Sequence, residues 1–249
     1  MSVHSLERDR AAENRIDAPA LLAISHGTDH PVGQRLVGAL VAAVQPLLPD
    51  VTVQPGFVDV QQPQAGELVL RHASDTQAPC LVPLLLSRGV HVNDDLAAAA
   101  ARNSGVKVAR ALGPDPVLAL VLERRLVQAG WQRGEPVILG CAGTRDPGGL
   151  EDCHQMARLL EQRLETMVRC AFVSASVPEL SRVVTEARQA HRGRRIVVSS
   201  YLLAPGFFWS LAGKTQPDIL TDPILSENYP IPHELAQLVV HRYRQATIG

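Results

Sequence analysis

An internal repeat constrains the fold of this chain more than any other feature of its sequence. Both copies contain an apolar segment, a Gly-Thr pair and then a proline, at residues 21–31 and again at 137–147. Two further blocks repeat in the same order, with offsets between 115 and 117: residues 57–63 match 172–178, and residues 84–89 match 201–206. A repeat of this length indicates two copies of one structural unit. We therefore predict one domain over residues 19–131 and a second, similar domain over residues 132–249.

Each copy has the pattern of a parallel α/β domain. Short apolar segments alternate with longer amphipathic ones, as in chains whose helices connect the parallel strands of one sheet. Residues 149–167, for example, carry apolar side chains at helical spacing, so this segment should pack one face on a sheet. Strands are expected near residues 20–25, 52–58, 80–86 and 106–110 in the first copy and 136–141, 169–174, 195–202 and 218–221 in the second. The predicted fold is α/β, with two similar parallel-sheet domains and a cleft between them.

Composition excludes several classes of protein. Residues 1–18 hold seven charged side chains and no apolar run, so we expect a disordered tail rather than a signal or transit peptide, and a cytoplasmic protein. No apolar stretch approaches the roughly 20 residues of a membrane helix. The 24 Lys and Arg residues nearly balance the 25 Asp and Glu residues, which gives no support for nucleic-acid binding.

The cysteines lack CxxC spacing and are expected to be free thiols, mostly buried: Cys80, Cys141, Cys153 and Cys170.

Polar side chains follow three predicted strands of the first copy. His26 comes after the first strand and Asp59 after the second, and His91 follows the third through a short segment that contains Gly89. In parallel sheets, ligands bind beyond the carboxyl ends of the strands. Each histidine alone is more typical of a capped helix start, but their matching positions, with Asp59 at a third strand end, make a shared site an equal alternative. Two imidazoles and a carboxylate suit divalent iron, cobalt or nickel, with coordination positions left open for a substrate.

Four ordered blocks of the first copy resemble the motifs of the sirohydrochlorin chelatases, including the cobalt-inserting members of cobalamin synthesis. The blocks are residues 25–28, 57–59, 82–91 and 112–116, and the resemblance extends over residues 19–249. It implies insertion of a divalent metal into a tetrapyrrole, in a cleft between two similar α/β domains. His26 and His91 match the two histidine positions of the family. Asp59 stands where the family usually has a glutamate, one methylene longer.

The second copy lacks these chemical groups. At the positions of His26, Asp59 and His91 it has Ala142, Ser174, and either Phe208 or Trp209. We therefore predict one site, built by the first copy and covered by the second. The aromatic segment of the second copy serves either as core or as a wall for the flat face of the macrocycle, so the predicted substrate contacts include Phe207 and Phe208. Thr28, Ser87 and Arg88 are the other predicted substrate contacts. Of these, Arg88 could bind a substrate carboxylate through two hydrogen bonds.

The predicted activity is that of a lyase-type chelatase that inserts Fe²⁺ or Co²⁺ into sirohydrochlorin, in siroheme or cobalamin biosynthesis, with no cofactor beyond the substrate metal. His26 and His91 would present the metal and accept pyrrole protons, because neutral imidazole does both near neutral pH. Asp59 would complete the metal shell or orient a histidine. The alternative is a tetrapyrrole or metal carrier without catalysis. A periplasmic-type binding protein shares the duplicated plan, but the expected export signal is absent from residues 1–18.

Overall fold

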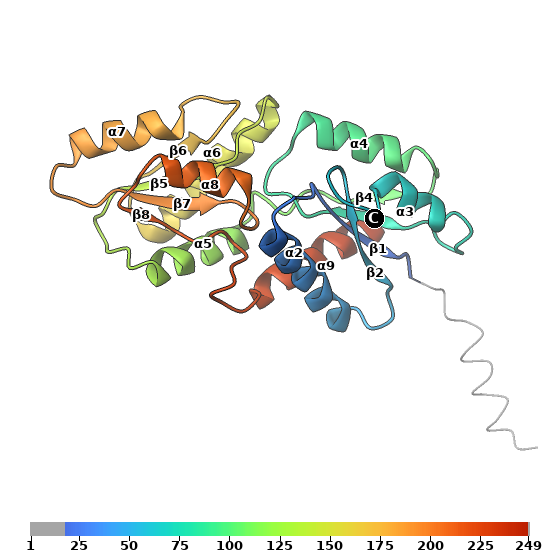
Figure 1. Cartoon of the computed structure of the whole chain (residues 1–249). Coiled ribbons are helices and arrows are strands. Elements are labelled where there is room, and N and C mark those ends of the chain that lie inside the picture. The colour runs from blue at the N-terminus through green and yellow to red at the C-terminus, as the bar shows by residue number, and fades with distance from the viewer. Residues whose placement is uncertain (1–17, 249) are drawn as a thin grey trace, which may run out of the picture.

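Two four-stranded parallel sheets form the framework of the molecule (Figure 1). The computed structural model describes residues 18–248, without the side chains of residues 90–93, so the predicted tail lies almost wholly outside the described residues. The first half contains β1 (Leu21–Ser25), α2 (Pro31–Val44), the 3-10 helix η1 (Gln45–Leu47), β2 (Val53–Phe57), α3 (Ala65–Arg71), β3 (Cys80–Pro83), α4 (Val90–Ala100), β4 (Lys107–Val108) and α5 (Pro116–Gln128). The second half contains β5 (Val137–Cys141), α6 (Pro147–Leu164), β6 (Val168–Phe172), α7 (Leu180–Ala190), β7 (Val197–Tyr201), α8 (Phe207–Lys214), β8 (Ile219–Leu220) and α9 (His233–Ile248).

The two sheets have the same topology and the same register. Their strand orders are β2-β1-β3-β4 and β6-β5-β7-β8. The first residue of each central strand has equivalent partners on both sides: Leu21 pairs with Val53 and Cys80, and Val137 pairs with Val168 and Val197. The predicted α/β fold with two similar parallel sheets is therefore confirmed. Several predicted strands are too long: β3 ends at Pro83 instead of residue 86, and β4 covers only Lys107–Val108 instead of 106–110.

Three helices begin at the same kind of sequence signal. Each has a proline in its first turn and an N-cap side chain that accepts a hydrogen bond from a backbone N–H of that turn. The caps are His30 for α2, Asp115 for α5 and Asp146 for α6. These caps fix where the chain leaves the strand-end loops, because they satisfy amide groups that the first helical turn leaves free.

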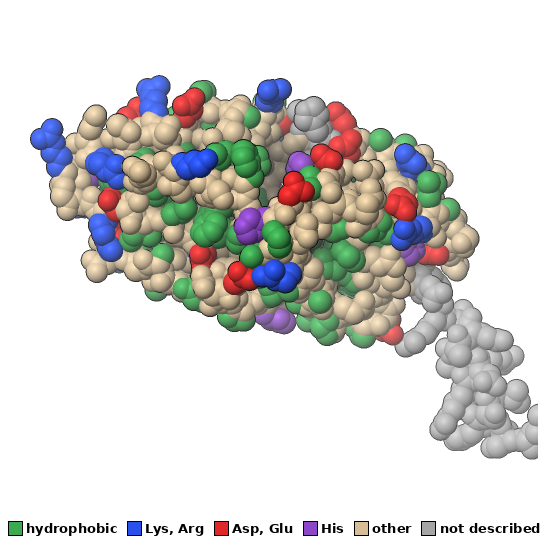
Figure 2. Space-filling model, in the orientation of Figure 1, with side chains coloured by type: hydrophobic (Ala, Val, Ile, Leu, Met, Phe, Trp, Pro, Cys, Tyr) green, Lys and Arg blue, Asp and Glu red, His purple; other side chains and the backbone are tan. Residues whose placement is uncertain are grey.

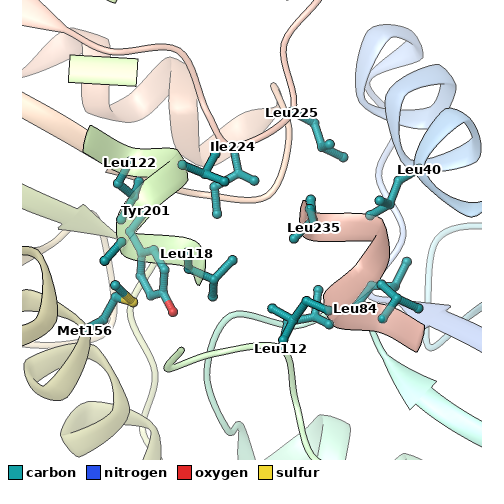
Figure 3. Close-up of a cluster of buried hydrophobic side chains, with 14 of the residues drawn as sticks. Leu40, Leu84, Leu112, Leu118, Leu122, Met156, Tyr201, Ile224, Leu225 and Leu235 are labelled. Carbon is teal, nitrogen blue, oxygen red and sulfur yellow. The ribbon is translucent and has the colours of Figure 1, made fainter. Parts of the chain in front are cut away.

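Alternate residues of each central strand face different layers. Leu22 and Ile24 of β1 pack against α3 and α4, while Leu21 and Ala23 face a larger core on the other side of the sheet. That larger core continues into the second half, where it includes Leu139 of β5. Figure 3 shows its centre, with Leu40, Leu84, Leu112 and Leu235 facing Leu118, Leu122, Met156 and Tyr201. The two halves thus share one hydrophobic core between their sheets.

The last helix of each half packs on the sheet of the other half. Helix α5 contacts α6 and β7, whereas α9 contacts α2, β3 and β4. In Figure 1, α5 lies beneath the second sheet and α9 lies beside α2 beneath the first. The predicted boundary between residues 131 and 132 falls in the connection between α5 and β5. This boundary between the two sequence repeats stays a prediction, because each repeat packs its last helix on the sheet of the other.

Two buried arginines hold the exchanged helices in place. On α5, Arg125 donates to the carbonyls of Pro223 (3.1 Å) and Ile224 (2.7 Å). On α9, Arg242 donates to the carbonyls of Ala111 (2.9 Å) and Leu112 (2.8 Å) and to the Asp115 carboxylate (2.7 Å). These hydrogen bonds connect α9 to the first half. Burial lowers the pKa of Arg125, because desolvation disfavours the charged guanidinium.

Within residues 18–248, none of the helices has the length and apolar character needed to span a membrane.

Candidate functional site

The strand order brings the three predicted site positions to one edge of the first sheet. β1 lies between β2 and β3, so the segments after these strands leave the sheet side by side. The backbone N–H of Asp59 donates to the carbonyl of His26 (3.0 Å), and that of Leu84 donates to the carbonyl of Ile24 (2.7 Å). Figure 2 shows a hollow in the surface between the two halves, bordered by histidine, acidic and hydrophobic side chains.

The turn after β1 requires glycine beside His26. Gly27 has a φ of 94°, and a Cβ at this position would lie 2.2 Å from the carbonyl oxygen of Asp59. The neighbouring turn is strained, because Val60 has a φ of 63°, a region that β-branched residues rarely adopt. Asp59 Oδ1 accepts a hydrogen bond from the backbone N–H of Val60 (2.7 Å). His26 and Asp59 are both exposed, so their side chains are accessible to an ion from solvent.

His91 lies in the first turn of α4, two residues after the N-cap Gly89. Its side chain is outside the described residues, so the predicted set of His26, Asp59 and His91 stays a prediction. Among the side chains that the structure does describe, no group of three or more His, Cys, Asp or Glu residues is arranged to hold a metal ion. The described part of the chain therefore supplies two of the three predicted ligands, on adjacent turns.

A loop of the second half lies against the turn that carries His26. A Cβ on Gly206 would be 3.4 Å from Thr28 Oγ1, and a Cβ on Gly33 would be 2.6 Å from the carbonyl oxygen of Pro205. Thr28 Oγ1 accepts a hydrogen bond from the backbone N–H of His30 (3.1 Å). The second-half loop is therefore close to the Thr28 side chain and to the first turn of α2.

The aromatic pair at the start of α8 follows this loop immediately. Phe207 and Phe208 are 70% and 40% exposed, and their rings meet edge to face with centroids 5.5 Å apart. Trp209 differs, because its indole N–H donates to the carbonyl of Thr221 (3.1 Å) and its side chain is partly buried. Of the aromatic residues in this segment, the two phenylalanines are therefore the ones that present open ring surface.

Arg88 is bound by a carboxylate of the protein itself. Its Nε and Nη2 donate to Asp152 on α6 (2.9 and 2.8 Å), and Nη2 also donates to the carbonyl of Gly148 (3.1 Å). Hydrogen bonding to Asp152 raises the pKa of Arg88 further above its ordinary value. The Arg88 side chain is still 54% exposed. Sequence reasoning did not single out Asp152, although an acidic residue on the apolar face of the segment 149–167 was a signal of a buried partner.

Three thiols of the second half lie close together, and one of them contacts Ser87 in the loop between β3 and α4. Cys141 and Cys170 have their sulfurs 3.8 Å apart, and Cys153 hydrogen-bonds Cys141. Burial raises the pKa of Cys141, whereas the hydrogen bond with Cys141 lowers the pKa of Cys153, to which Ser87 also donates. The prediction of free thiols is confirmed, with Cys170 only partly buried.

The equivalent turns of the second half keep this geometry without the chemistry. Gly143 has a φ of 106°, and a Cβ there would lie 1.8 Å from the carbonyl oxygen of Ser174. Ala175 repeats the left-handed conformation, with a φ of 57°. The Ser174 hydroxyl donates to the carbonyl of Ala142 (3.1 Å), so it is engaged within its own turn. These turns have the backbone of a site but present neither imidazole nor carboxylate at the matching positions.

Comparison with known proteins agrees with this architecture. The sequence model of the CbiX family matches residues 20–129 and 136–211. The chain belongs to the CbiX family. A comparison with curated protein sequences gave no match.

Solved structures show the same fold at low sequence identity. SirB from Bacillus subtilis with Fe³⁺ has a TM-score of 0.74 and 21% identity, and the match covers 92% of this chain and 96% of SirB. SirB from the subspecies spizizenii in complex with cobalt has a TM-score of 0.70 and 20% identity, covering 93% and 96%. CbiX, the terminal enzyme for biosynthesis of siroheme in denitrifying bacteria, has a TM-score of 0.62 and 17% identity, covering 89% and 98%. The fold of this family member therefore extends over nearly the whole described chain.

Proposed function

We propose that the protein is a sirohydrochlorin chelatase that inserts Fe²⁺ or Co²⁺ into the macrocycle and releases two protons. The observation that carries the proposal is the meeting of the His26 and Asp59 turns at the end of adjacent strands, with the third strand leading to His91. SirB, which shares the fold, is a sirohydrochlorin chelatase that has been solved with iron and with cobalt. Membership of the CbiX family supports the same activity.

In this proposal the substrate metal enters at the exposed turns of the first half. His26 and His91 hold the ion, because neutral imidazole is a good ligand of borderline divalent metals. Two pyrrole N–H protons must leave as four ring nitrogens replace the ligands of the ion. A histidine that has released the metal has a free nitrogen lone pair and can accept one of these protons. Asp59 completes the metal shell or orients a histidine, and its exposure supports direct access to the ion.

The tetrapyrrole would bind across the two halves. Phe207 and Phe208 offer exposed rings to the flat face of the macrocycle, from a loop that touches the Thr28 turn. Arg88 keeps an exposed part of its guanidinium for a substrate carboxylate while Asp152 binds its other edge. Thr28 and Ser87 are the remaining polar contacts of the proposed substrate site. The proposal requires no cofactor beyond the substrate metal.

The test is anaerobic incubation of the protein with sirohydrochlorin and either Fe²⁺ or Co²⁺, followed by the absorbance of the metallated product. A chelatase forms many equivalents of product per protein, faster than the metal inserts without protein. A carrier binds one equivalent and gives no excess of metallated ring, which would contradict the proposal. Comparing the two metals under equal conditions assigns the preferred substrate.

A further inference from the structure

The loop between β3 and α4 changes its partners before it reaches His91. Leu84 donates from its backbone N–H to the carbonyl of Ile24 (2.7 Å), and the carbonyl of Leu85 accepts from the N–H of Gly113 (3.2 Å). Both contacts belong to the first half. From the next residue on, the loop bonds to the second half.

Residues 86–88 are bonded one after another to side chains of the second half. The Tyr201 hydroxyl donates to the carbonyl of Leu86 (2.6 Å). Asp152 Oδ2 accepts from the backbone N–H of Arg88 (2.8 Å), in addition to the two bonds from the guanidinium. The residue between them donates to a thiol of α6. The second half therefore holds the last residues of the loop before Gly89 caps α4.

The second-half partners in these contacts are buried and closely packed against the loop. Tyr201 is 3% exposed and Asp152 is 5% exposed. A Cβ on Gly149, one turn before Cys153 on α6, would lie 2.2 Å from the carbonyl oxygen of Arg88, so helix and loop are too close for a side chain at this position. Buried hydrogen bonds of this kind are costly to remove, because the remaining partner stays out of contact with water.

The opposite contact between the halves has different side chains. The repeat places Leu36 where Asp152 stands and Pro205 where Arg88 stands. There the second-half loop approaches α2 at Gly33, through the carbonyl of Pro205. Of these two contacts between the halves, the charged pair is therefore found only at the loop that leads to His91.

We propose that Asp152 and Tyr201 are positioning residues for His91, and that the second half fixes the place of this histidine relative to His26. The inference rests on the proposed function, because His91 matters only if it binds the substrate metal. Groups that orient a metal ligand typically change metal affinity by about 10- to 100-fold when they are removed. The half without ligands then contributes to the metal site by holding a ligand of the other half.

The first experiment measures the contact itself by hydrogen exchange. We expect Asp152→Asn and Tyr201→Phe each to increase exchange of the amides of residues 86–93 by about tenfold or more. Glu234→Gln is the matched control, since it breaks another ion pair between the halves, the one between α9 and Arg124 on α5. It should leave this segment unchanged. Unaltered exchange in both test variants would overturn the inference, and Tyr201→Phe keeps it testable if Asp152→Asn does not fold.

The second experiment asks whether the contact acts through His91. Co²⁺ titration should show that Asp152→Asn weakens binding by about 10- to 100-fold in the otherwise natural protein. In the His91→Ala background the same substitution should have little further effect, and Asp152→Glu should restore part of the affinity. An equal loss in both backgrounds would mean that Asp152 acts on the fold in general and would overturn the positioning role. If His91→Ala alone leaves Co²⁺ binding unchanged, the proposed metal site is wrong, whatever the exchange data show.

Discussion

The two halves of the molecule share their backbone geometry and differ in the groups they present to solvent. Both have a left-handed glycine after the central strand, Gly27 and Gly143, each pressed against the carbonyl of the neighbouring turn. In the first half these turns carry His26 and Asp59, which are exposed. At the matching places the second half has an alanine and Ser174, whose hydroxyl bonds its own turn.

This difference shows which constraints belong to the fold and which to the chemistry. A side chain at either glycine would collide with backbone, so the fold excludes substitution there in both halves. By contrast, substitution of the exposed His26 or Asp59 would cause no such collision. The second half has the same sheet without these groups, and its residues Asp152 and Tyr201 bind the loop of the first half.

The largest expected effect comes from making the first half resemble the second at the central strand. His26→Ala should lower the rate of metal insertion by about 10²- to 10⁴-fold, the range for loss of a proton-accepting or metal-presenting group. Because His26 is exposed, the free energy of unfolding should change by less than about 0.5 kcal/mol. Ser174→Ala, which alters the turn of the second half, is the control and should insert metal at an unchanged rate. Natural rates in His26→Ala from pH 5 to 8 would refute the assignment.

A large effect on stability is expected where the halves exchange helices. Arg242→Ala should lower the free energy of unfolding by about 3–5 kcal/mol, because it leaves Asp115 and two carbonyls without this partner. Arg125→Ala removes a buried arginine from carbonyls and from the ring of Tyr229, and should cost less. Urea unfolding measures both. Arg124→Ala, on a partly exposed ion pair, should cost under about 1 kcal/mol. A cost as small as this for Arg242→Ala and Arg125→Ala would mean that the exchanged helices do not depend on the buried arginines.

The two glycines at the contacts between the halves should have different functional effects. Gly149→Ala pushes on the carbonyl of Arg88 and should weaken Co²⁺ binding by about tenfold, since it moves the loop that leads to His91. Gly33→Ala pushes on the carbonyl of Pro205 and should raise the KM for sirohydrochlorin, because the aromatic segment follows that loop. Metal titration and steady-state kinetics separate the two. Identical profiles would show that the halves respond as one rigid unit.

The smallest effect is visible only in alkaline solution. Burial raises the pKa of the Cys80 thiol to about 11, whereas an unfolded thiol ionises near about 8.5. The folded state therefore favours the neutral thiol, and its contribution to stability is complete below about pH 8.5 and is lost as pH rises toward 11. Cys80→Val, which copies Val197 of the second half, should reduce the loss of stability over this window. Burial also raises the pKa of Tyr243, so some loss should remain. An identical pH dependence in the variant would contradict the raised thiol pKa.

The repeat and the apolar periodicity determined most of the fold from the sequence. Strand positions follow from apolar segments bounded by glycine and proline, and helix starts follow from caps such as Asp146 with the proline after it. The positions of His26 and Asp59 at adjacent strand ends also follow, because parallel strands direct their carboxyl ends to one edge. These features are local or depend only on the order of strands, and both are written along the chain.

Contacts between distant residues were decided only by the tertiary structure. The exchange of α5 and α9 could not be predicted, because an amphipathic helix buries its apolar face equally well on either of two similar sheets. The partner of Arg88 could not be predicted either, since a guanidinium binds a substrate carboxylate and the Asp152 carboxylate by the same geometry. Sequence determines which groups a chain offers, and packing decides which of them meet.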